Sequence, residues 1–263
     1  MILDTLAEAT RVRVEEAKQK VSFEEMKQRA ALVHKTPFAF EMALKKSNQE
    51  KGIAFICEVK KASPSKGIIA DQFPYLEIAA EYEKIGADCL SVLTEPEYFK
   101  GSNEYLREIA AKVTIPILRK DFTIDEYMIY EAKALGADAV LLIMSLLNDE
   151  TVTAYLHLCE NLGLSALVET HNAEEIKRAA QAGARIIGVN NRNLKDFTVD
   201  VENCINLQKE MPQNVITVAE SGISGAEEVS RIKESGIHAV LIGETLMRSG
   251  NRKETIQQLR GSL

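Results

Sequence analysis

An acid and a base occur together in one apolar segment of the sequence, residues 54–67 (AFICEVKKASPSKG). The segment opens with apolar residues, as a strand does when it is buried on both faces. Because side chains alternate along a strand, Glu58 and Lys60 share a face with Ile56. Charges in an apolar environment are costly unless they are paired. Such a pair is suited to proton transfer, and the alternative is a buried ion pair with no chemical role.

Polar side chains also end several other apolar segments of the chain. Lys120 shares a face with Leu118, and Glu169 shares one with Leu167 by the same alternation. If these segments are parallel strands of one barrel, their carboxyl ends meet at a single mouth, where barrel enzymes hold their active sites. The alternative is that paired charges only plug that end of the barrel. The candidates for acid–base chemistry are Glu58, Lys60, Lys120, Glu169, Asn190 and Glu220.

The elements that must position these side chains follow from a repeated pattern. A helical segment ends in glycine and then continues into an apolar run at Gly86, Gly136, Gly163, Gly183 and Gly236. Each glycine stands where a helix can stop in a left-handed turn. Apolar runs without polar alternation are typical of parallel strands. Together with residues 55–60, 115–122 and 215–220, these runs predict eight strands separated by helices.

Eight strand–helix units in series predict an α/β protein with a single (β/α)8 TIM barrel. With 263 residues, of which 46% are hydrophobic, the chain can bury one large core, so we expect residues 1–263 to form one domain. A doubly wound open sheet is the alternative. That fold more often carries a GxGxxG turn after its first strand, and this sequence has none there.

About 50 residues precede the first predicted strand, and they have helical patterns. Leu3, Leu6, Val14 and Ala17 form an apolar stripe, and Ser22 begins a capping box before a second helix over residues 26–32. A third helix is expected over residues 38–44. We expect these additional N-terminal helices to cover the active face of the barrel.

Two glycine-containing turns follow the seventh and eighth predicted strands. Ser221 and Gly222 end one strand, and Gly243 and Glu244 end the other. In each turn a glycine lets the backbone approach an anion closely, and a helix then begins with free N–H groups. Barrels often bind phosphate after these two strands. The turn over residues 63–67 adds two hydroxyl groups, those of Ser63 and Ser65.

Composition narrows the function classes further. A formal net charge of −7 argues against a nucleic-acid surface. No apolar run approaches the length of ~20 residues that spans a bilayer, and the acidic start is unlike a targeting peptide. The four cysteines form no CxxC pair, which predicts free core thiols in a reducing compartment. We therefore expect a cytoplasmic globular protein that binds neither nucleic acid nor membranes.

The remaining titratable candidates have weaker patterns. Four histidines show no metal-ligand spacing, so no metal site is expected. Of these, His171 follows Glu169 by two residues, which favours an accessory role. Asp121 has the opposite parity to Lys120 and is interpreted as a structural helper.

Seven ordered motifs carry a resemblance to a known family: EVKKASPSKG, TEPEYFKGS, ILRKDF, LVET, GVNNRNL, AESGIS and LIGE. In this order the chain resembles the indole-3-glycerol phosphate synthases of tryptophan biosynthesis, from its N-terminal helices to Arg248. The resemblance implies a (β/α)8 barrel with added N-terminal helices. It also implies a cofactor-free reaction that closes the indole ring of 1-(2-carboxyphenylamino)-1-deoxyribulose 5-phosphate, with loss of carbon dioxide and water.

The resemblance further implies a role for each candidate residue. Lys120 is the expected general acid at the ribulose carbonyl, and Glu169 takes part in the later proton removal. Lys60 binds the carboxylate or serves as a second acid. The residues expected to hold and tune these groups, or to contact the substrate, are Glu58, Asn190, Glu220, Arg192, Phe99, Phe122, Leu141, Leu194, Ser63, Ser65, Ser221, Gly222, Gly243 and Glu244. At the position of Glu244 some relatives carry serine. Glu244 leaves backbone N–H donation to phosphate in place, but it does not offer the serine hydroxyl.

Two other functions stay open at this point. A phosphoribosylanthranilate isomerase would explain the phosphate turns, but not the pair of Glu58 and Lys60 or the added helices. A degenerate barrel that binds a phosphate ligand without turnover is the non-enzymatic alternative, against which the intact set of Lys60, Lys120 and Glu169 argues. We expect a phosphorylated small-molecule substrate and a monomer or weak oligomer, and docking to neighbouring pathway enzymes stays open.

Overall fold

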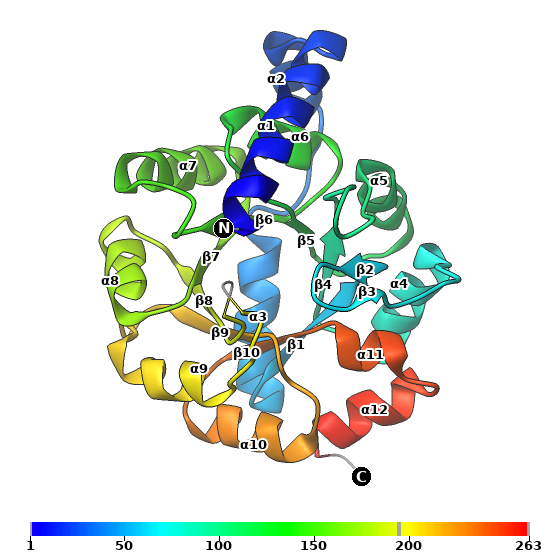
Figure 1. The fold of residues 1–263 in the computed structure, drawn as a ribbon, viewed down its shortest axis with the longest axis vertical. Coiled ribbons are helices and arrows are strands. Elements are labelled where there is room, and N and C mark those ends of the chain that lie inside the picture. The colour runs from blue at the N-terminus through cyan, green and yellow to red at the C-terminus, as the bar shows by residue number, and fades with distance from the viewer. Residues whose placement is uncertain (1, 194–195, 262–263) are drawn as a thin grey trace.

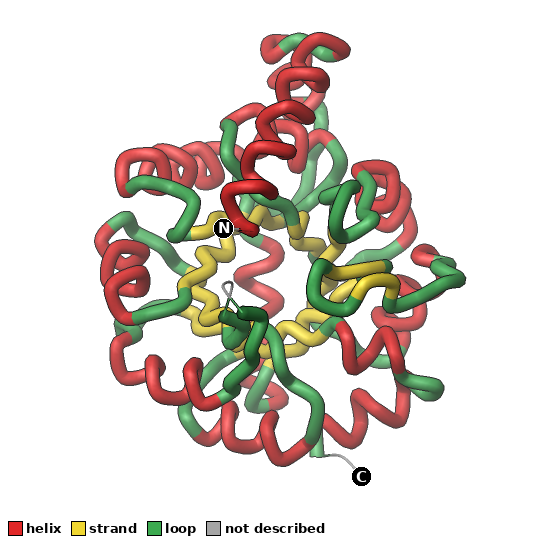
Figure 2. Tube along the Cα trace, in the orientation of Figure 1, coloured by secondary structure: helices red, strands yellow, loops and turns green. Residues whose placement is uncertain are grey.

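A closed barrel of eight parallel strands forms the centre of the computed structural model, which describes residues 2–193 and 196–261. Every strand pairs with its sequence neighbours, and the last strand pairs with the first. The ring of strands is visible end-on in Figure 2. This confirms the predicted TIM barrel. The strands are β1 (Ala54–Val59), β4 (Cys89–Leu93), β5 (Ile117–Lys120), β6 (Ala139–Ile143), β7 (Ser165–Thr170), β8 (Ile186–Asn190), β9 (Ile216–Glu220) and β10 (Ala239–Ile242).

Helices surround the barrel and connect successive strands (Figure 1). The five glycines that end helical patterns all have positive φ, as predicted. A short hairpin of β2 (Ala62–Ser63) and β3 (Gly67–Ile68) follows β1. The outer helices are α4 (Tyr75–Lys84), α5 (Asn103–Lys112), α6 (Glu126–Ala134), α7 (Asp149–Leu162), α8 (Ala173–Gln181), α9 (Glu202–Leu207) with the 3-10 turn η1 (Gln208–Glu210), α10 (Ala226–Glu234), α11 (Glu244–Arg248) and α12 (Arg252–Leu259).

Side-chain alternation divides the core into two layers. Ile56, Leu118, Leu167 and Val218 pack inside the barrel, as the parity of the sequence predicts. The residues of opposite parity, such as Phe55, pack between the strands and the outer helices. All four cysteines are buried and unpaired, in agreement with the predicted core thiols.

The three N-terminal helices, α1 (Ile2–Lys20), α2 (Phe23–Ala31) and α3 (Ala39–Lys51), do not share one location. Helix α1 begins at the carboxyl ends of the strands, and Leu3 and Leu6 reach into the cavity there. Helix α2 packs against α6. Its first turn is capped as predicted, since Glu25 N donates to Ser22 Oγ.

Helix α3 corrects the expectation that all the added helices cover the active face. It closes the opposite end of the barrel and is seen through the ring of strands in Figure 1. Glu41 N donates to Oγ of Ser165, the first residue of β7, and Phe40 contributes its carbonyl to Cys89, the first residue of β4. Phe40 and Leu44 are fully buried inside the barrel. The helix lies there because these apolar side chains fill the amino end of the barrel.

Candidate active site

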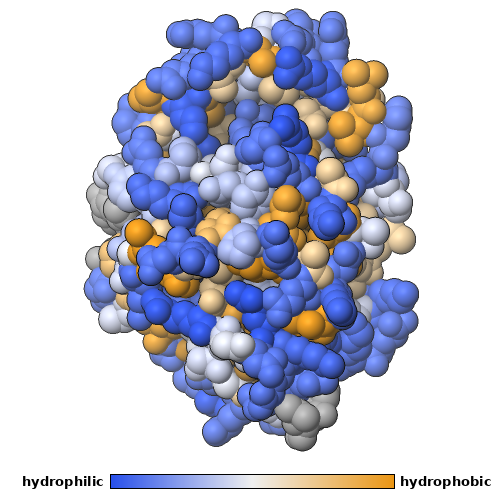
Figure 3. All heavy atoms as spheres, turned by 90° about the vertical axis from the view of Figure 1, so that its right-hand side faces the viewer, coloured by the Kyte–Doolittle hydropathy of each residue, from blue (hydrophilic) through white to orange (hydrophobic). Residues whose placement is uncertain are grey.

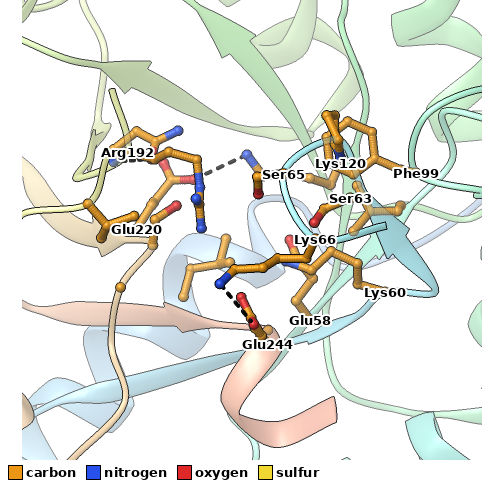
Figure 4. A pocket seen from close by; sticks show the side chains of 18 of the residues that line it. Glu58, Lys60, Ser63, Ser65, Lys66, Phe99, Lys120, Arg192, Glu220 and Glu244 are labelled. Carbon is orange, nitrogen blue, oxygen red and sulfur yellow. Dashed lines mark hydrogen bonds and ion pairs between the residues drawn. The ribbon is translucent and has the colours of Figure 1, made fainter. Parts of the chain in front are cut away.

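A cavity of about 650 Å³ opens at the carboxyl ends of the strands, a volume within the usual range for small-molecule sites. It brings together residues from all eight barrel strands and from loops directly after them (Figure 4). Leu194 lies outside the described residues. The other predicted site residues all line the cavity: Glu58, Lys60, Ser63, Ser65, Phe99, Lys120, Phe122, Leu141, Glu169, Asn190, Arg192, Glu220, Ser221, Gly222, Gly243 and Glu244.

Lys120 lies between two carboxylates at the base of this cavity. Its Nζ is 2.9 Å from Glu169 Oε2 and 3.2 Å from Glu220 Oε2. Asn190 Nδ2 donates to the other oxygen of Glu169 at 3.1 Å. All three charged side chains are largely buried. Lys120 thus contacts one acid on β7 and one on β9. Such an arrangement can transfer protons.

Glu58 and Lys60 form the second charged pair of the cavity. Lys60 Nζ lies 2.6 Å from Glu58 Oε1, and Ser91 Oγ donates to Glu58 Oε2 at 3.3 Å. Ser91 lies on β4, the strand next to β1, at the position that pairs with Glu58. The pair predicted from strand parity therefore exists and points into the cavity.

Burial and mutual charge set the protonation of the lysine and its two partners. Burial by itself lowers the pKa of Lys120, but the surrounding carboxylates outweigh it and hold that pKa well above its ordinary value. Burial raises the pKa of Glu169, yet Lys120 and His171 overcome this and lower it to about 2. Burial raises the pKa of Glu220 to about 7. The charge of Lys120 lowers this pKa, but the charge of Glu169 offsets that lowering. Near neutral pH the group therefore holds Glu169 ionised, Lys120 charged and Glu220 partly protonated.

The raised pKa of Glu220 makes the stability of the protein depend on pH. A glutamate in the unfolded chain titrates near ~4.3, whereas Glu220 titrates at about 7 when folded. Its contribution to the free energy of unfolding is therefore present below about pH 4 and is lost as the pH rises through about 7. Glu220→Gln stays neutral, so we expect its melting temperature to rise relative to wild type between about pH 5 and about pH 8.

Calorimetric melting at a series of pH values checks this expectation. Glu169 does not contribute in that window, because its lowered pKa of about 2 gives stability that is lost only as the pH falls through that value. The exposed Glu174 of α8 supplies the control variant, Glu174→Gln. A difference between Glu220→Gln and wild type that stays constant across the window would contradict the assignment.

Gly188 is a site residue whose role sequence reasoning missed. It stands two residues before Asn190, on the same inner face of β8. A Cβ there would lie 2.2 Å from Glu220 Oε1 and 3.2 Å from Leu167 Cδ1. The absence of a side chain at this position is what leaves room for the Glu220 carboxylate. Gly188 is therefore a positioning residue for the group around Lys120. Its inward parity was visible in the sequence, but its neighbour across the sheet was not.

We expect Gly188→Ala to lower kcat by about 10²-fold with little change in KM, because a displacement of about 1 Å in a catalytic group costs that much. The added methyl would push the Glu220 carboxylate away from Lys120. Shortening that side chain in Gly188→Ala/Glu220→Asp should restore part of the loss. Steady-state kinetics measure both effects, with Gly250→Ala as the control because its Cβ would meet open space. Full kcat in Gly188→Ala would rule out this role.

The two predicted phosphate glycines have a second physical reason, beside the expected approach of a phosphate. Gly222 has φ +80°, and a Cβ there would lie 2.2 Å from Val199 Cγ1 in the loop after β8. A Cβ on Gly243 would lie 2.5 Å from Glu58 Oε1 and 2.9 Å from Lys60 Nζ. Both glycines line the cavity, but protein atoms occupy the space of their missing side chains. They are needed for contacts within the protein before any ligand binds.

Asp121 links the mouth to helix α1. Arg13 donates to both of its carboxylate oxygens, at 2.8 and 2.6 Å, and Thr94 donates to one of them. Burial alone would raise the pKa of Asp121, but Arg13 and Arg119 hold it below its ordinary value. This ionised, fully paired carboxylate agrees with the predicted structural role. The added helices were expected to cover the active face, but the contact of Arg13 with Asp121 was not predicted, because the sequence does not show which barrel residue an arginine of α1 meets.

Aromatic and cationic side chains complete the walls of the cavity. Phe99 and Phe122 pack with ring centroids 6.1 Å apart. Glu95 shapes the turn that carries Phe99, since its carboxylate accepts from three successive backbone N–H groups. Arg192 donates from Nη1 to Phe197 O and from its backbone to Asn190 Oδ1. These contacts fix an aromatic pair and a guanidinium in the walls of the same cavity.

His171 contacts Glu169 but is not among the residues that line the cavity. Its Nε2 is 3.5 Å from Glu169 Oε1, and its Nδ1 is 3.2 Å from Glu175 Oε2. Burial lowers the pKa of His171, but Glu175 and Glu169 raise it by more, so that it lies above its ordinary value. Among the described residues no cluster of three or more His, Cys, Asp or Glu side chains is placed to hold a metal ion. None of the described helices is long and apolar enough to cross a membrane.

Comparison with known proteins adds two kinds of similarity. Two solved structures share the fold alone: a 3-hexulose-6-phosphate synthase (TM-score 0.64, 13% identity, 80% of this chain and 100% of that one) and a thiamine phosphate pyrophosphorylase from Pyrococcus furiosus (TM-score 0.60, 16% identity, 81% and 96%). Sequence relatives are much closer. The chain is 53% identical to an indole-3-glycerol phosphate synthase of Ruminiclostridium cellulolyticum over the full length of both. It is 52% identical to one of Endomicrobium trichonymphae over 99% of this chain and 100% of the relative.

The family model for indole-3-glycerol phosphate synthase matches residues 3–259, which include all three N-terminal helices and every strand of the barrel. The match supports neither of the two alternatives, the phosphoribosylanthranilate isomerase and the phosphate-binding barrel without turnover. The chain belongs to the indole-3-glycerol phosphate synthase family.

Proposed function

We propose that Lys120 is the general acid of the ring closure that this carboxy-lyase of tryptophan biosynthesis catalyses. The reaction converts 1-(2-carboxyphenylamino)-1-deoxyribulose 5-phosphate into indole-3-glycerol phosphate, carbon dioxide and water. It needs a proton at the ketone oxygen, an exit for carbon dioxide, and a base for the final loss of water. The cavity offers a matching group for each need.

Ring closure is the first demand. The ring carbon that bears the carboxylate attacks the ribulose ketone carbon, and the ketone oxygen takes a proton from Lys120. Lys120 is well suited because Glu169 and Glu220 keep it charged and hold its Nζ in one place. An aromatic ring attacks poorly in water, and the slot formed by Phe99 and Phe122 holds it away from solvent.

Decarboxylation follows without an added electron acceptor. The bond from the ring carbon to the carboxylate breaks, and its electron pair moves toward the iminium nitrogen of the new ring and restores the aromatic system. Arg192 lines the same cavity, and we assign it to the carboxylate before that group leaves. Lys60, held by Glu58, is the second cation near this group.

Dehydration completes the indole. Glu169 accepts the proton from the carbon next to the ring nitrogen, which its lowered pKa of about 2 allows because it is ionised at neutral pH. Lys60 donates a proton to the departing hydroxyl group. Asn190 and Glu220 hold these groups in position through their contacts with Glu169 and Lys120.

The single observation that supports this assignment is the contact of Lys120 with two acids at the base of a cavity whose rim carries hydroxyl groups and cations. Incubation of the purified protein with the substrate, followed by indole fluorescence and released carbon dioxide, tests it. We expect one equivalent of carbon dioxide for each indole. A fluorescent product formed without carbon dioxide, or no product, would contradict the proposal.

We also propose that the protein acts as a monomer or a weak oligomer in the cytoplasm. Among the side chains that the structure describes, the exposed large apolar ones are Val12, Leu32, Met42, Ile68 and Val199, and they stand on five different segments. The face over α4, α5, α11 and α12 is mainly polar, with apolar side chains interspersed (Figure 3). Stable interfaces usually need a contiguous apolar patch. Sedimentation analysis tests the oligomeric state, and docking to neighbouring pathway enzymes stays a prediction.

A further inference from the structure

Glu244 places a negative charge on the cavity wall where the substrate's phosphate is expected. The residue follows Gly243 at the end of β10 and begins α11. Its Oε1 lies 3.8 Å from Lys66 Nζ and 3.1 Å from Arg248 Nε. Figure 4 shows the Lys66 side chain reaching across the cavity to Glu244. The Glu244 carboxylate thus already pairs with Lys66, the cation that an incoming phosphate would need.

Lys66 belongs to a turn equipped for an anion. It lies between β2 and β3, and its backbone N–H donates to Ser63 O at 3.3 Å. The same turn presents the hydroxyl groups of Ser63 and Ser65 to the cavity. Neither hydroxyl has a hydrogen-bond partner among the described residues. By contrast, Thr245, which also lines the cavity, already donates to Ile223 O. The hydroxyl groups of Ser63 and Ser65 are therefore open donors in the same turn as Lys66.

The charge balance of the cavity makes the position of Glu244 significant. Cationic and acidic side chains are equal in number among the described lining residues, which are Lys60, Lys66, Lys120, Arg192 and Arg248 on one side and Glu58, Asp121, Glu169, Glu220 and Glu244 on the other. The substrate carries a carboxylate and a phosphate, a charge of about −3 near neutral pH. Of the acids, Glu244 alone lies against Lys66, so it is the one that competes directly with the phosphate.

We propose that the substrate's phosphate replaces Glu244 as the partner of Lys66, and that Arg248 keeps Glu244 neutralised while it does so. The free enzyme then holds an internal carboxylate in the place of the phosphate and releases it on binding. This inference rests on the proposed function, since it places the phosphate of that substrate beside Ser63 and Ser65.

Partial exposure makes the exchange inexpensive. The Lys66 and Glu244 side chains are 47% and 31% exposed, and ion pairs with that much solvent contact contribute little to stability. A phosphate carries more charge than a carboxylate and offers three acceptor oxygens, so it can bind Lys66 and both serine hydroxyls together. Arg248 is four residues from Glu244 in α11 and can keep its contact after Lys66 turns away.

Calorimetric titration of the full chain with inorganic phosphate tests the exchange without relying on turnover. We expect Glu244→Gln to bind phosphate about five- to tenfold more tightly than wild type, because a like charge about 4 Å away is removed. Glu174→Gln changes the net charge equally but lies far from the cavity on α8, and it should bind phosphate as wild type does. Lys66→Met should weaken binding and should also reduce the gain from Glu244→Gln in the double variant.

Arg248→Gln separates neutralisation from simple attraction. It should weaken phosphate binding in the wild-type background by leaving Glu244 without its cation, and much less in the Glu244→Gln background. Equal or weaker phosphate binding by Glu244→Gln would overturn the proposal, since Glu244 would then be holding Lys66 in place for the phosphate. Phosphate that fails to compete with the substrate in every variant would overturn it too. Turnover of the substrate by the wild type is measured separately, so a failed exchange is distinguishable from a failed reaction assignment.

Discussion

Replacing Lys120 with alanine should lower kcat by about 10³-fold or more while KM changes only a few-fold. The lysine is the expected proton donor at the ketone oxygen, and a positioned acid supplies about 10²- to 10⁴-fold in rate. We expect other residues to contact the phosphate and the carboxylate of the substrate. The loss should therefore fall on kcat.

The same substitution has a second effect through the neighbouring acids. Glu169 and Glu220 both face Lys120, and Lys120 is the main charge that lowers the pKa of Glu169. Without the cation, two buried carboxylates face each other, so the pKa of Glu169 must rise. The variant thus loses its acid and, near neutral pH, part of its base. This is why we expect an effect at the upper end of the usual range.

Stopped-flow and steady-state fluorescence measure kcat and KM, and circular dichroism checks the fold. Lys112→Ala, at the exposed end of α5, is the control for removal of a lysine. Substrate binding by the Lys120→Ala variant should be measurable by calorimetry. Turnover near that of the wild type would show that another group protonates the ketone oxygen.

Two truncations of the N-terminal region should give opposite results. Deletion of residues 1–20 removes α1, including Leu3 and Leu6 at the cavity and Arg13 beside Asp121. We expect a folded barrel with a raised KM. Deletion of residues 1–46 also removes Phe40 and Leu44, which are fully buried inside the barrel. That protein should fail to fold.

The size of the second effect follows from the cost of an empty barrel end. Replacing a single buried phenylalanine with alanine costs about 3–5 kcal/mol, whereas whole domains are stable by only about 5–15 kcal/mol. Loss of two such side chains is comparable to that margin, and loss of their helix adds to it. Phe40→Ala tests the point without truncation, and Met42→Ala on the same helix is its control because Met42 is 57% exposed.

Urea unfolding and melting curves distinguish the two truncations. A protein lacking residues 1–46 that melts cooperatively near the wild-type temperature would show that α3 is dispensable. A protein lacking residues 1–20 that keeps the wild-type KM would show that α1 does not shape the cavity.

Strand parity allowed most of the site to be predicted from the sequence. Lys120, Glu169 and Glu220 were assigned to one mouth because alternation places each on the face of a buried apolar residue, and the structure brings all three within ion-pair distance. This worked because parity is a local property of a strand. The closed barrel then places the strand ends together whatever the details of packing.

Features that depend on distant contacts could not be predicted in the same way. The sequence shows apolar side chains in the first half of α3, but not which end of the barrel has room for them. The glycines give a similar case, since Gly243 faces Glu58 and Gly222 faces Val199, neighbours that lie far away in the sequence. The sequence shows a glycine at each of these two positions, whereas the atom that a side chain there would meet is known only from the fold.

The pairing of β1 with β10 has a consequence for how the protein is made. These strands are hydrogen-bonded along the seam of the barrel, with Cys57 opposite Ile242, although almost the whole barrel lies between them in the chain. A ribosome releases β1, with Glu58 at its end, long before Gly243 exists. Contacts of such long sequence separation form late and slowly. The nascent chain must therefore carry an unpaired strand edge until synthesis reaches its last tenth, and chaperones that bind strand edges have their longest opportunity at β1.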